Sequence, residues 1–401
     1  MIEKLLKPEV QKFIYAHRSD DTHALALAGN SVSGVPMMAV SEQIKGHQKA
    51  KQKLPEWYET HGLVYPPPIS MEQCSSEKAA KNKAELISGA RLIDLTGGFG
   101  VDTFYLSKDF SETIYVEQNE WLCSLAQNNF KQLGKTIEIN QSTAEDFINT
   151  YDSKADVIYL DPARRSADQQ RVYRWEDCSP DVTSLLDKLF AIAPKILIKA
   201  SPLLDLTQAV NALSAVVRVE VVAVDNDCKE VLYLLDRQQE SQLKMVAKNF
   251  TSSGNVQSFS FTKEEEATSQ INYSPPLRFL YEPNVAIYKA GAFKSVGNAF
   301  NLNKIAPNTH LYTSNELQHN FPGRIFEIVS CFAFNKKALK KHFDKSKANI
   351  AVRNFPVDVK GIRKKLEIKP GGDDYLFGVT DHENNKVIIH GCKISYDQVS
   401  Q

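Results

Sequence analysis

The chain has 401 residues, enough for two or three domains with their own hydrophobic cores, and its 48 Lys and Arg residues balance 48 Asp and Glu residues. The overall charge therefore neither favours nor excludes a nucleic-acid partner. Six cysteines without a C-x-x-C pair argue against a zinc cluster or a disulfide framework, and the absence of a signal peptide or an apolar run of about 18 residues favours a cytoplasmic protein with no membrane or metal partner.

The first part of the chain, residues 1–88, is predicted to be mostly helical. The segment EKLLKPEVQKFIYAH has a helical period of apolar residues. Ser75 or Ser76 is expected to cap a further helix, because a small polar residue followed by Glu77 and a run of helix formers is typical of a helix start.

Strands alternate with helices between residues 89 and 238. The first five strands are expected at 91–96, 112–117, 135–140, 155–161 and 195–201. Such β–α repeats predict a parallel sheet with helices on both faces. Two more strands follow, at 216–225 and 230–236, and the four residues between them are too few for a crossover helix, so the two strands should form an antiparallel hairpin.

The C-terminal part is predicted to contain smaller α+β modules. Residues 239–272 are polar and mixed in pattern, so residues 239–322 are expected to hold a linker and a small module. Residues 323–401 suggest a second module, with a strand, a basic helix, a strand, a helix and two more strands.

A glycine-rich turn, DLTGGFGVDT, lies where the first strand of the sheet meets its helix. Gly97, Gly98 and Gly100 allow close approach of a ligand to the backbone, and Thr96 belongs to the same turn. Asp94 is a candidate to bind the ammonium group of a methionine moiety, directly or through water. A structural turn without a ligand is the alternative interpretation.

Further candidates for binding an adenosyl group follow the second and third strands. Glu117 ends the second strand, where a carboxylate can accept hydrogen bonds from both ribose hydroxyls. Gln118 directly follows it and Asp102 closely follows the glycines of the turn, so both are further candidates. After the third strand, the Ala144 N–H group, Glu145 or Asp146 is a candidate to recognise adenine. An acidic helix start is the alternative there.

The stretch VIYLDPARRS ends the fourth strand at the ligand-binding edge of the sheet. Asp161 and Pro162 occupy the position of the catalytic D/N-P-P-Y/F motif of amino-methyltransferases, so they are the candidate catalytic residues. Ala163 replaces the second proline, and no aromatic residue follows. Arg164 and Arg165 offer forked donors suited to the phosphates of a substrate.

Basic residues are concentrated near the C-terminus. From Arg324 to Lys393 there are 15 Lys and Arg residues against 8 Asp and Glu residues. Lys364 and Lys365 lie on a predicted basic helix and are candidate RNA-binding residues, with an ordinary solvated helix face as the alternative.

Taken together, the motifs QCSSE, DLTGGFGVD, LDPARR, RVYRWEDCSPD and GGDDYLFG resemble a family of bacterial class I S-adenosylmethionine-dependent methyltransferases with a C-terminal THUMP-like domain, best represented in Bacteroidetes. The resemblance implies an α/β fold with a Rossmann-like seven-stranded methyltransferase sheet, an N-terminal helical region, and small C-terminal ferredoxin-like and THUMP-like modules. It also implies S-adenosyl-L-methionine as cofactor and Gln73, Ser75 or Ser76 near its methionine end.

The predicted function is methylation of a base in structured RNA, tRNA or rRNA, with the THUMP-like domain binding the RNA. Three alternatives stay open: a methyltransferase for a small molecule or protein, a cofactor-binding RNA module without turnover, and, more remotely, a dehydrogenase. Thermal stabilisation by adenosylhomocysteine rather than NAD would separate the last of these from the others.

Overall fold

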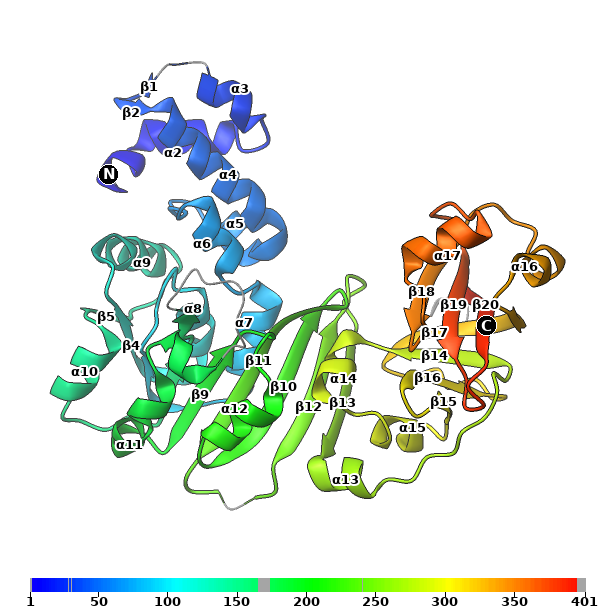
Figure 1. Cartoon of the computed structure of the whole chain (residues 1–401). Helices are drawn as coiled ribbons and strands as arrows, with labels where there is room; N and C mark the ends of the chain where they lie inside the picture. The colour runs from blue at the N-terminus through cyan, green and yellow to red at the C-terminus, as the bar shows by residue number, and fades with distance from the viewer. Residues whose placement is uncertain (1, 28, 30, 165–173, 240, 395–401) are drawn as a thin grey trace. The chain divides into compact units, whose positions relative to one another are not determined.

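The computed structural model of the chain describes residues 2–27, 29, 31–164, 174–239 and 241–394 (Figure 1). It divides into two compact units. The first holds Met1–Val219 with Glu230–Ser241, and the second holds Glu220–Lys229 with Gln242–Gln401. None of the helices within the described ranges is long and apolar enough to cross a membrane.

The predicted helical region is confirmed at the N-terminus of the first unit. Val40, Ile44 and Trp57 are fully buried in its apolar core, so the periodic apolar residues do face inward. Ser76 caps the last of these helices by accepting a hydrogen bond from the Ala79 N–H group at 3.3 Å. The elements are α1 (Ile2–Leu5), α2 (Pro8–Ala16), α3 (Thr22–Leu27), β1 (Ser31–Val32), β2 (Val35–Pro36), α4 (Met37–Lys53), α5 (Pro55–Glu59), α6 (Pro68–Gln73) and α7 (Glu77–Ala84).

A mixed sheet with the strand order β13-β12-β10-β11-β9-β6-β3-β4-β5 follows. All seven predicted strands are present, and β3, β4, β5, β6 and β9 are parallel, while β11 runs antiparallel to β9. The strands of this sheet are β3 (Gly89–Asp94), β4 (Phe110–Glu117), β5 (Glu138–Gln141), β6 (Val157–Leu160), β9 (Lys195–Ala200), β10 (Val216–Val224), β11 (Asp227–Asp236), β12 (Lys244–Phe250) and β13 (Val256–Thr262).

Helices and short elements connect the parallel strands. All four residues of β6 are buried, as expected for a central strand covered on both faces. The connecting elements are α8 (Val101–Leu106), η1 (Ser107–Asp109), α9 (Glu120–Gln132), α10 (Ala144–Thr150), β7 (Ala163–Arg164), η2 (Trp175–Asp177), β8 (Cys178–Ser179), α11 (Val182–Ile192) and α12 (Leu206–Ala212).

Two strands, β12 and β13, lie in the stretch that the sequence suggested was a polar exit. Their pairing is antiparallel and continuous from Lys244 opposite Thr262 to Phe250 opposite Val256. Only the centre of β12 is apolar and buried, and β13 alternates apolar with polar residues. Neither strand therefore has the long apolar run that marks a buried parallel strand in a sequence. The hairpin before them turns at Asp225 and Asn226, which have φ angles of 51° and 61°; its two-residue turn is shorter than predicted.

The rest of the second unit forms a seven-stranded sheet with the order β15-β16-β14-β17-β20-β19-β18. The predicted C-terminal pattern of strand, helix, strand, helix and two strands is present from β17 onward. The elements are α13 (Lys263–Thr268), β14 (Phe279–Pro283), α14 (Val285–Ala290), α15 (Ser295–Ala299), β15 (Asn303–Ala306), β16 (Thr309–Ser314), β17 (Gly323–Ala333), α16 (Lys336–His342), β18 (Asn349–Arg353), α17 (Val359–Leu366), β19 (Asp374–Thr380) and β20 (Lys386–Lys393).

Candidate active site

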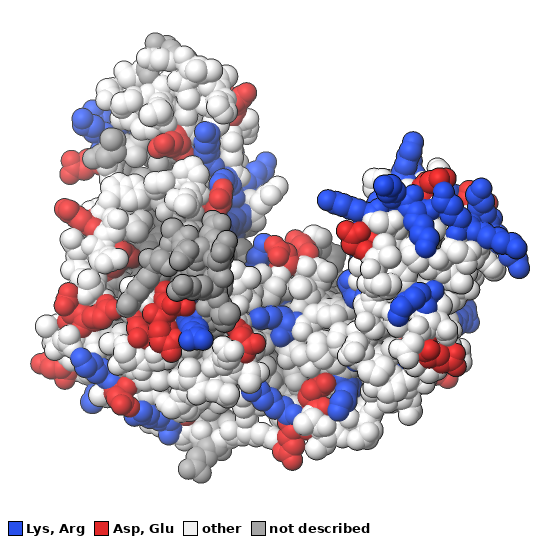
Figure 2. All heavy atoms as spheres, in the orientation of Figure 1, with Lys and Arg blue, Asp and Glu red and all other residues white. Residues whose placement is uncertain are grey.

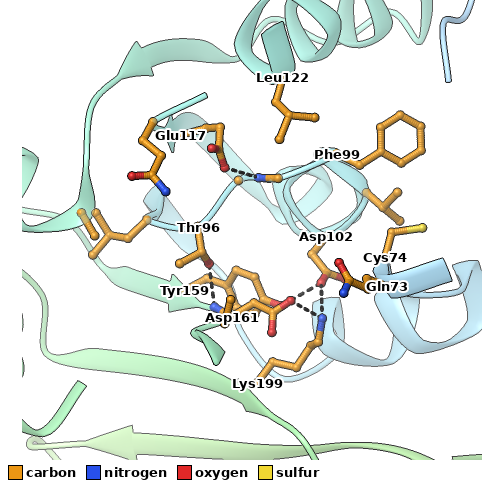
Figure 3. A pocket seen from close by; sticks show the side chains of 18 of the residues that line it. Gln73, Cys74, Thr96, Phe99, Asp102, Glu117, Leu122, Tyr159, Asp161 and Lys199 are labelled. Carbon is orange, nitrogen blue, oxygen red and sulfur yellow. Dashed lines mark hydrogen bonds and ion pairs between the residues drawn. The ribbon is translucent and has the colours of Figure 1, made fainter. Parts of the chain in front are cut away.

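A cavity of about 300 Å³ in the first unit gathers most of the predicted site residues (Figure 3). It lies at the carboxyl ends of β3, β4 and β6, where open α/β sheets bind ligands. Gln73 and Ser75, which the sequence suggested for the methionine end of a cofactor, also line it. The predicted cofactor-binding residues that line the cavity are Thr96, Gly97, Gly98, Gly100, Asp102, Glu117, Gln118, Ala144, Glu145 and Asp161.

The glycine-rich turn needs glycine at two positions for different reasons. A Cβ atom on Gly97 would lie 2.1 Å from the ring of Tyr115, so a larger residue cannot fit there. Gly100 has a φ of 84° at the start of α8, a left-handed conformation that glycine adopts without strain. The turn therefore brings bare backbone to the wall of the cavity.

Glu117 closes this turn from the end of β4. One carboxylate oxygen accepts a hydrogen bond from the Gly98 N–H group at 3.0 Å (Figure 3), and the other accepts one from the Asn119 N–H group at 2.8 Å. Each carboxylate oxygen retains acceptor capacity toward the cavity, because it has more than one lone pair. Glu117 is thus fixed in orientation and able to accept hydroxyl donors.

Asp94 lies behind the turn and is absent from the described residues that line the cavity. It is 1% exposed, and its two oxygens accept hydrogen bonds from the Thr96 N–H group at 2.9 Å and the Thr103 hydroxyl at 2.6 Å. Burial raises the pKa of Asp94 to about 7, although these hydrogen bonds oppose the rise. In this structure Asp94 holds the turn, and its predicted contact with a ligand, directly or through water, stays a prediction.

Asp161 lines the cavity just beyond the end of β6. Its N–H group donates to the Thr96 hydroxyl at 2.6 Å, and its carboxylate forms an ion pair with Lys199 from the end of β9 (Figure 3). Pro162 is partly exposed but does not line the cavity. Arg164 pairs through its backbone with Cys178, and Arg165 lies outside the described residues.

A second carboxylate, Asp102, lies deeper in the wall. It accepts hydrogen bonds from the Tyr159 hydroxyl at 2.7 Å and the Ser75 hydroxyl at 2.9 Å, and Lys83 Nζ is 3.2 Å away. Burial alone would raise the pKa of Asp102, but the ammonium groups of Lys83 and Lys199 outweigh it and hold that pKa below its ordinary value. Asp102 is therefore ionised at neutral pH.

The remaining members of this charge network are buried behind the cavity. Lys83 on α7 is fully buried and donates to both oxygens of Glu230 on β11, at 2.7 and 2.8 Å. Lys199 Nζ lies 3.7 Å from an oxygen of Asp102. Burial alone would lower the pKa of Lys199, but the carboxylates of Asp161, Asp102 and Glu230 raise it, so Lys199 carries its positive charge.

Sequence reasoning missed Lys199 and Lys83 as site residues. Lys199 follows the apolar run ILI in a strand with the pattern KILIKA, and a charged residue at the carboxyl end of a buried parallel strand is a usable signal. Lys83 is one of several lysines on α7, so nothing in the local pattern distinguishes it from the exposed Lys81.

The predicted RNA-binding lysines belong to the second unit. Lys364 and Lys365 are exposed on α17, and Lys365 Nζ lies 4.1 Å from the centre of the Phe334 ring. Ile362 and Leu366 of the same helix are buried, so the helix presents its apolar side to the sheet and its basic side to solvent. Figure 2 shows Lys and Arg side chains gathered over the region where α16 and α17 lie in Figure 1.

The strand order and the position of the cavity define a class I methyltransferase fold, in which a parallel sheet closes with an antiparallel hairpin. Family models agree with this class and with the modules that follow it. Residues 78–175 match the family described as conserved hypothetical protein 95, residues 279–322 match a ferredoxin-like domain, and residues 323–393 match a THUMP domain-like family.

Among solved structures, a protein from Porphyromonas gingivalis W83, described provisionally as a methyltransferase, is 32% identical to this chain, with a TM-score of 0.84 over 96% of this chain and 97% of that one. The chain therefore belongs to the family of that protein, a methyltransferase family with ferredoxin-like and THUMP-like modules. No curated protein sequence matches the chain.

Two other solved structures match less than half of this chain. M. capricolum TrmK, solved with S-adenosyl-homocysteine, has 13% identity and a TM-score of 0.33 over 41% of this chain and 70% of that one. An rRNA methylase from Streptococcus thermophilus has 13% identity and a TM-score of 0.30 over 40% and 95%. Likeness at this level says nothing of the substrate of this chain.

Proposed function

We propose that the chain transfers a methyl group from S-adenosyl-L-methionine to RNA, with the cavity of the first unit as the active site. The observation that carries this proposal is the set of predicted adenosyl-binding residues around one cavity at the ligand-binding edge of the sheet. When bound, the cofactor would supply an activated methyl group on a sulfonium, and in-line transfer from it needs positioning rather than a metal.

The residues of the cavity suit the parts of that cofactor. Glu117, oriented by the Gly98 N–H group, is suited to accept the ribose hydroxyls, and the backbone at Gly97 allows close approach. Ala144 and Glu145 begin α10 and are suited to the adenine edge. The ionised Asp102 suits the cationic methionine end, because an acidic wall attracts a sulfonium and an ammonium group.

Asp161 is the proposed catalytic residue. Its backbone is held by Thr96 and its carboxylate by Lys199, so the carboxylate has a fixed direction at the cavity wall. From there it would orient the acceptor and take its proton. Pro162 would act by ending the strand at that point and Arg164 and Arg165 by contacting substrate phosphates, as the sequence suggests.

RNA is the proposed substrate because of the second unit. The THUMP domain-like match and the exposed lysines of α16 and α17 both favour contact with phosphates. Lys336, Lys337, Lys340 and Lys341 are exposed on α16, in addition to Lys364 and Lys365 on α17. The sequence-based expectation of tRNA or rRNA is part of this proposal and rests on the resemblance to methyltransferases with a THUMP-like domain. A base is the acceptor expected from the same resemblance, although Ala163 and the absence of a following aromatic residue in the sequence weaken that expectation.

The experiment that tests the proposal compares modified nucleosides by mass spectrometry in RNA from cells with and without the gene. The proposal predicts at least one methylated nucleoside that is lost on deletion and restored by the wild-type chain. The Asp161→Asn variant should not restore it, whereas Asp152→Asn, which changes an exposed aspartate that precedes β6 in the chain, should. If the RNA is unchanged and a small molecule or a protein is methylated instead, the substrate belongs to the alternative class and the RNA proposal is wrong.

A further inference from the structure

Lys199 places a positive charge at the proposed point of methyl transfer. Within the described residues that line the cavity it is the one Lys or Arg, its side chain is 11% exposed, and its ammonium group pairs with Asp161. The carboxylates of Asp102 and Glu230 behind it keep it protonated. The acceptor atom, wherever it meets Asp161, must therefore react beside a fixed cation.

This cation discriminates between acceptor atoms. A neutral exocyclic amine that attacks a sulfonium gains positive charge on nitrogen as the new bond forms, and an ammonium group beside it would oppose that charge. A hydroxyl that loses its proton during the attack carries partial negative charge on oxygen, and the same ammonium group would stabilise it. Lys199 thus favours an oxygen acceptor.

Among the described residues that line the cavity, no aromatic ring presents a free face to a flat base. Phe99 and Tyr159 are the aromatic residues among its described lining, and they are 5% and 1% exposed. The Phe99 ring packs against Trp57 with centroids 4.9 Å apart, and the Tyr159 hydroxyl donates to Asp102. Neither side chain is available to stack on a base, which recognition of a splayed base usually requires.

We infer that the acceptor is a ribose 2′-hydroxyl of RNA and that Lys199 and Asp161 act on it as a catalytic pair. This inference rests on the proposed RNA methyl transfer and replaces the base with the sugar as the acceptor. The hydroxyl proton passes to the Asp161 carboxylate, and the oxygen electron pair forms the new O–C bond. The S–C bond breaks at the same time, and its electron pair leaves the sulfur as a neutral thioether. Lys199 donates a hydrogen bond to the oxygen and keeps its proton.

The test uses the full-length protein, S-adenosylmethionine labelled in the methyl group, and total RNA from cells that lack the gene. Alkali cleaves RNA through its 2′-hydroxyl, so a 2′-O-methylated nucleotide remains joined to its neighbour. The inference predicts label in alkali-resistant dinucleotides. Label in mononucleotides would overturn it and leave RNA methyl transfer standing, and no label in RNA, with cofactor binding shown by calorimetry, would overturn the proposed function itself.

A matched pair of variants tests Lys199 on the same strand. Lys199→Met should lower the turnover number by about 100-fold or more, with the dissociation constant for adenosylhomocysteine changed by less than about 3-fold. Lys195→Met, at the other end of β9 and half-exposed beside Asp236, should leave both unchanged. Lys199→Arg should restore part of the rate, and it replaces the Met variant if that one does not fold. Full activity of the Lys199→Met variant, or loss of activity in the Lys195→Met control, would contradict the assignment.

Discussion

Lys83 and Glu230 form a fully buried ion pair between residues 147 positions apart in the chain. The lysine comes from the helix before the first parallel strand and the glutamate from the antiparallel strand β11, so the pair ties the start of the sheet to its closing hairpin. Asp102 lies 3.2 Å from the same ammonium group. The buried ammonium group of Lys83 therefore supports Asp102, which lines the wall of the candidate active-site cavity.

Removing one partner of this pair should lower the free energy of unfolding more than removing both partners does. Lys83→Met leaves Glu230 buried without its cation, and we expect the free energy of unfolding of the first unit to fall by about 3–5 kcal/mol. The double variant Lys83→Met/Glu230→Leu should recover more than half of that loss. Denaturant titration measures both values, and additive losses in the double variant would show that the two residues do not act as a pair.

Glu117 should control cofactor affinity. Glu117→Ala removes the proposed ribose acceptor, and we expect the dissociation constant for adenosylhomocysteine to rise by about 10–100-fold, since two charge-assisted hydrogen bonds are lost. Glu120→Ala, three residues away and exposed at the start of α9, is the matched control. Calorimetric titration checks both, and equal affinity of the two variants would remove Glu117 from the binding site.

Asp94 should make the protein less stable as the pH rises from about 4 to about 7. In the folded state Asp94 has a pKa of about 7, whereas in the unfolded chain its carboxyl group ionises near the ordinary value of 3.8. Between these two values ionisation of Asp94 lowers the free energy of the unfolded state only, so the free energy of unfolding falls. Asp94→Asn carries no such charge. Its stability relative to the wild type should therefore rise by up to about 4 kcal/mol between pH 4 and pH 7.

Denaturant midpoints for the wild type and Asp94→Asn, measured at intervals across that pH window, check this prediction. Above pH 7 the difference between the two proteins should stay constant, because Asp94 is then ionised in both states. A pH-independent difference throughout would mean that Asp94 has an ordinary pKa in the folded protein.

The lysines of α17 should contribute non-specific affinity for RNA. Lys364→Ala/Lys365→Ala should weaken binding at 0.1 M salt and reduce the slope of log K against log salt by about 1–2, since each phosphate contact contributes about 0.9 or less. Lys244→Ala, an exposed lysine of the same unit on β12, serves as the control. A double variant with the wild-type slope would mean that these side chains are only a solvated helix face.

The sequence predicted the parts of the fold that have a strong local pattern. The apolar runs that become β3, β6 and β9, and the short interval before β11, were sufficient for the sheet and its hairpin. β12 and β13 were missed because alternation such as VQSFSF in a polar context is a weaker signal than a continuous apolar run.

The candidate site was predictable where the strand tips and the glycine-rich turn supply it, and not where the fold brings distant charges together. Glu117 is the last residue of β4 and Asp161 directly follows β6, so their positions follow from the strand pattern. The partners Lys83, Lys199 and Glu230 come from three separate elements, and only the folded chain shows that they meet. Asp94 was expected to bind a ligand directly or through water; the structure adds its hydrogen bonds to Thr96 and Thr103, which are local contacts that a motif does not reveal.

The central claim is that an adenosyl cofactor lies in this cavity with its reactive end toward Asp161, and a crystal structure with bound S-adenosylhomocysteine tests it most directly. The account predicts the ribose hydroxyls at the Glu117 carboxylate, the adenine beside Ala144, and the sulfur facing the Asp161–Lys199 pair. Density for the nucleoside at any other place on the chain, or an orientation with the sulfur turned away from Asp161, would contradict it.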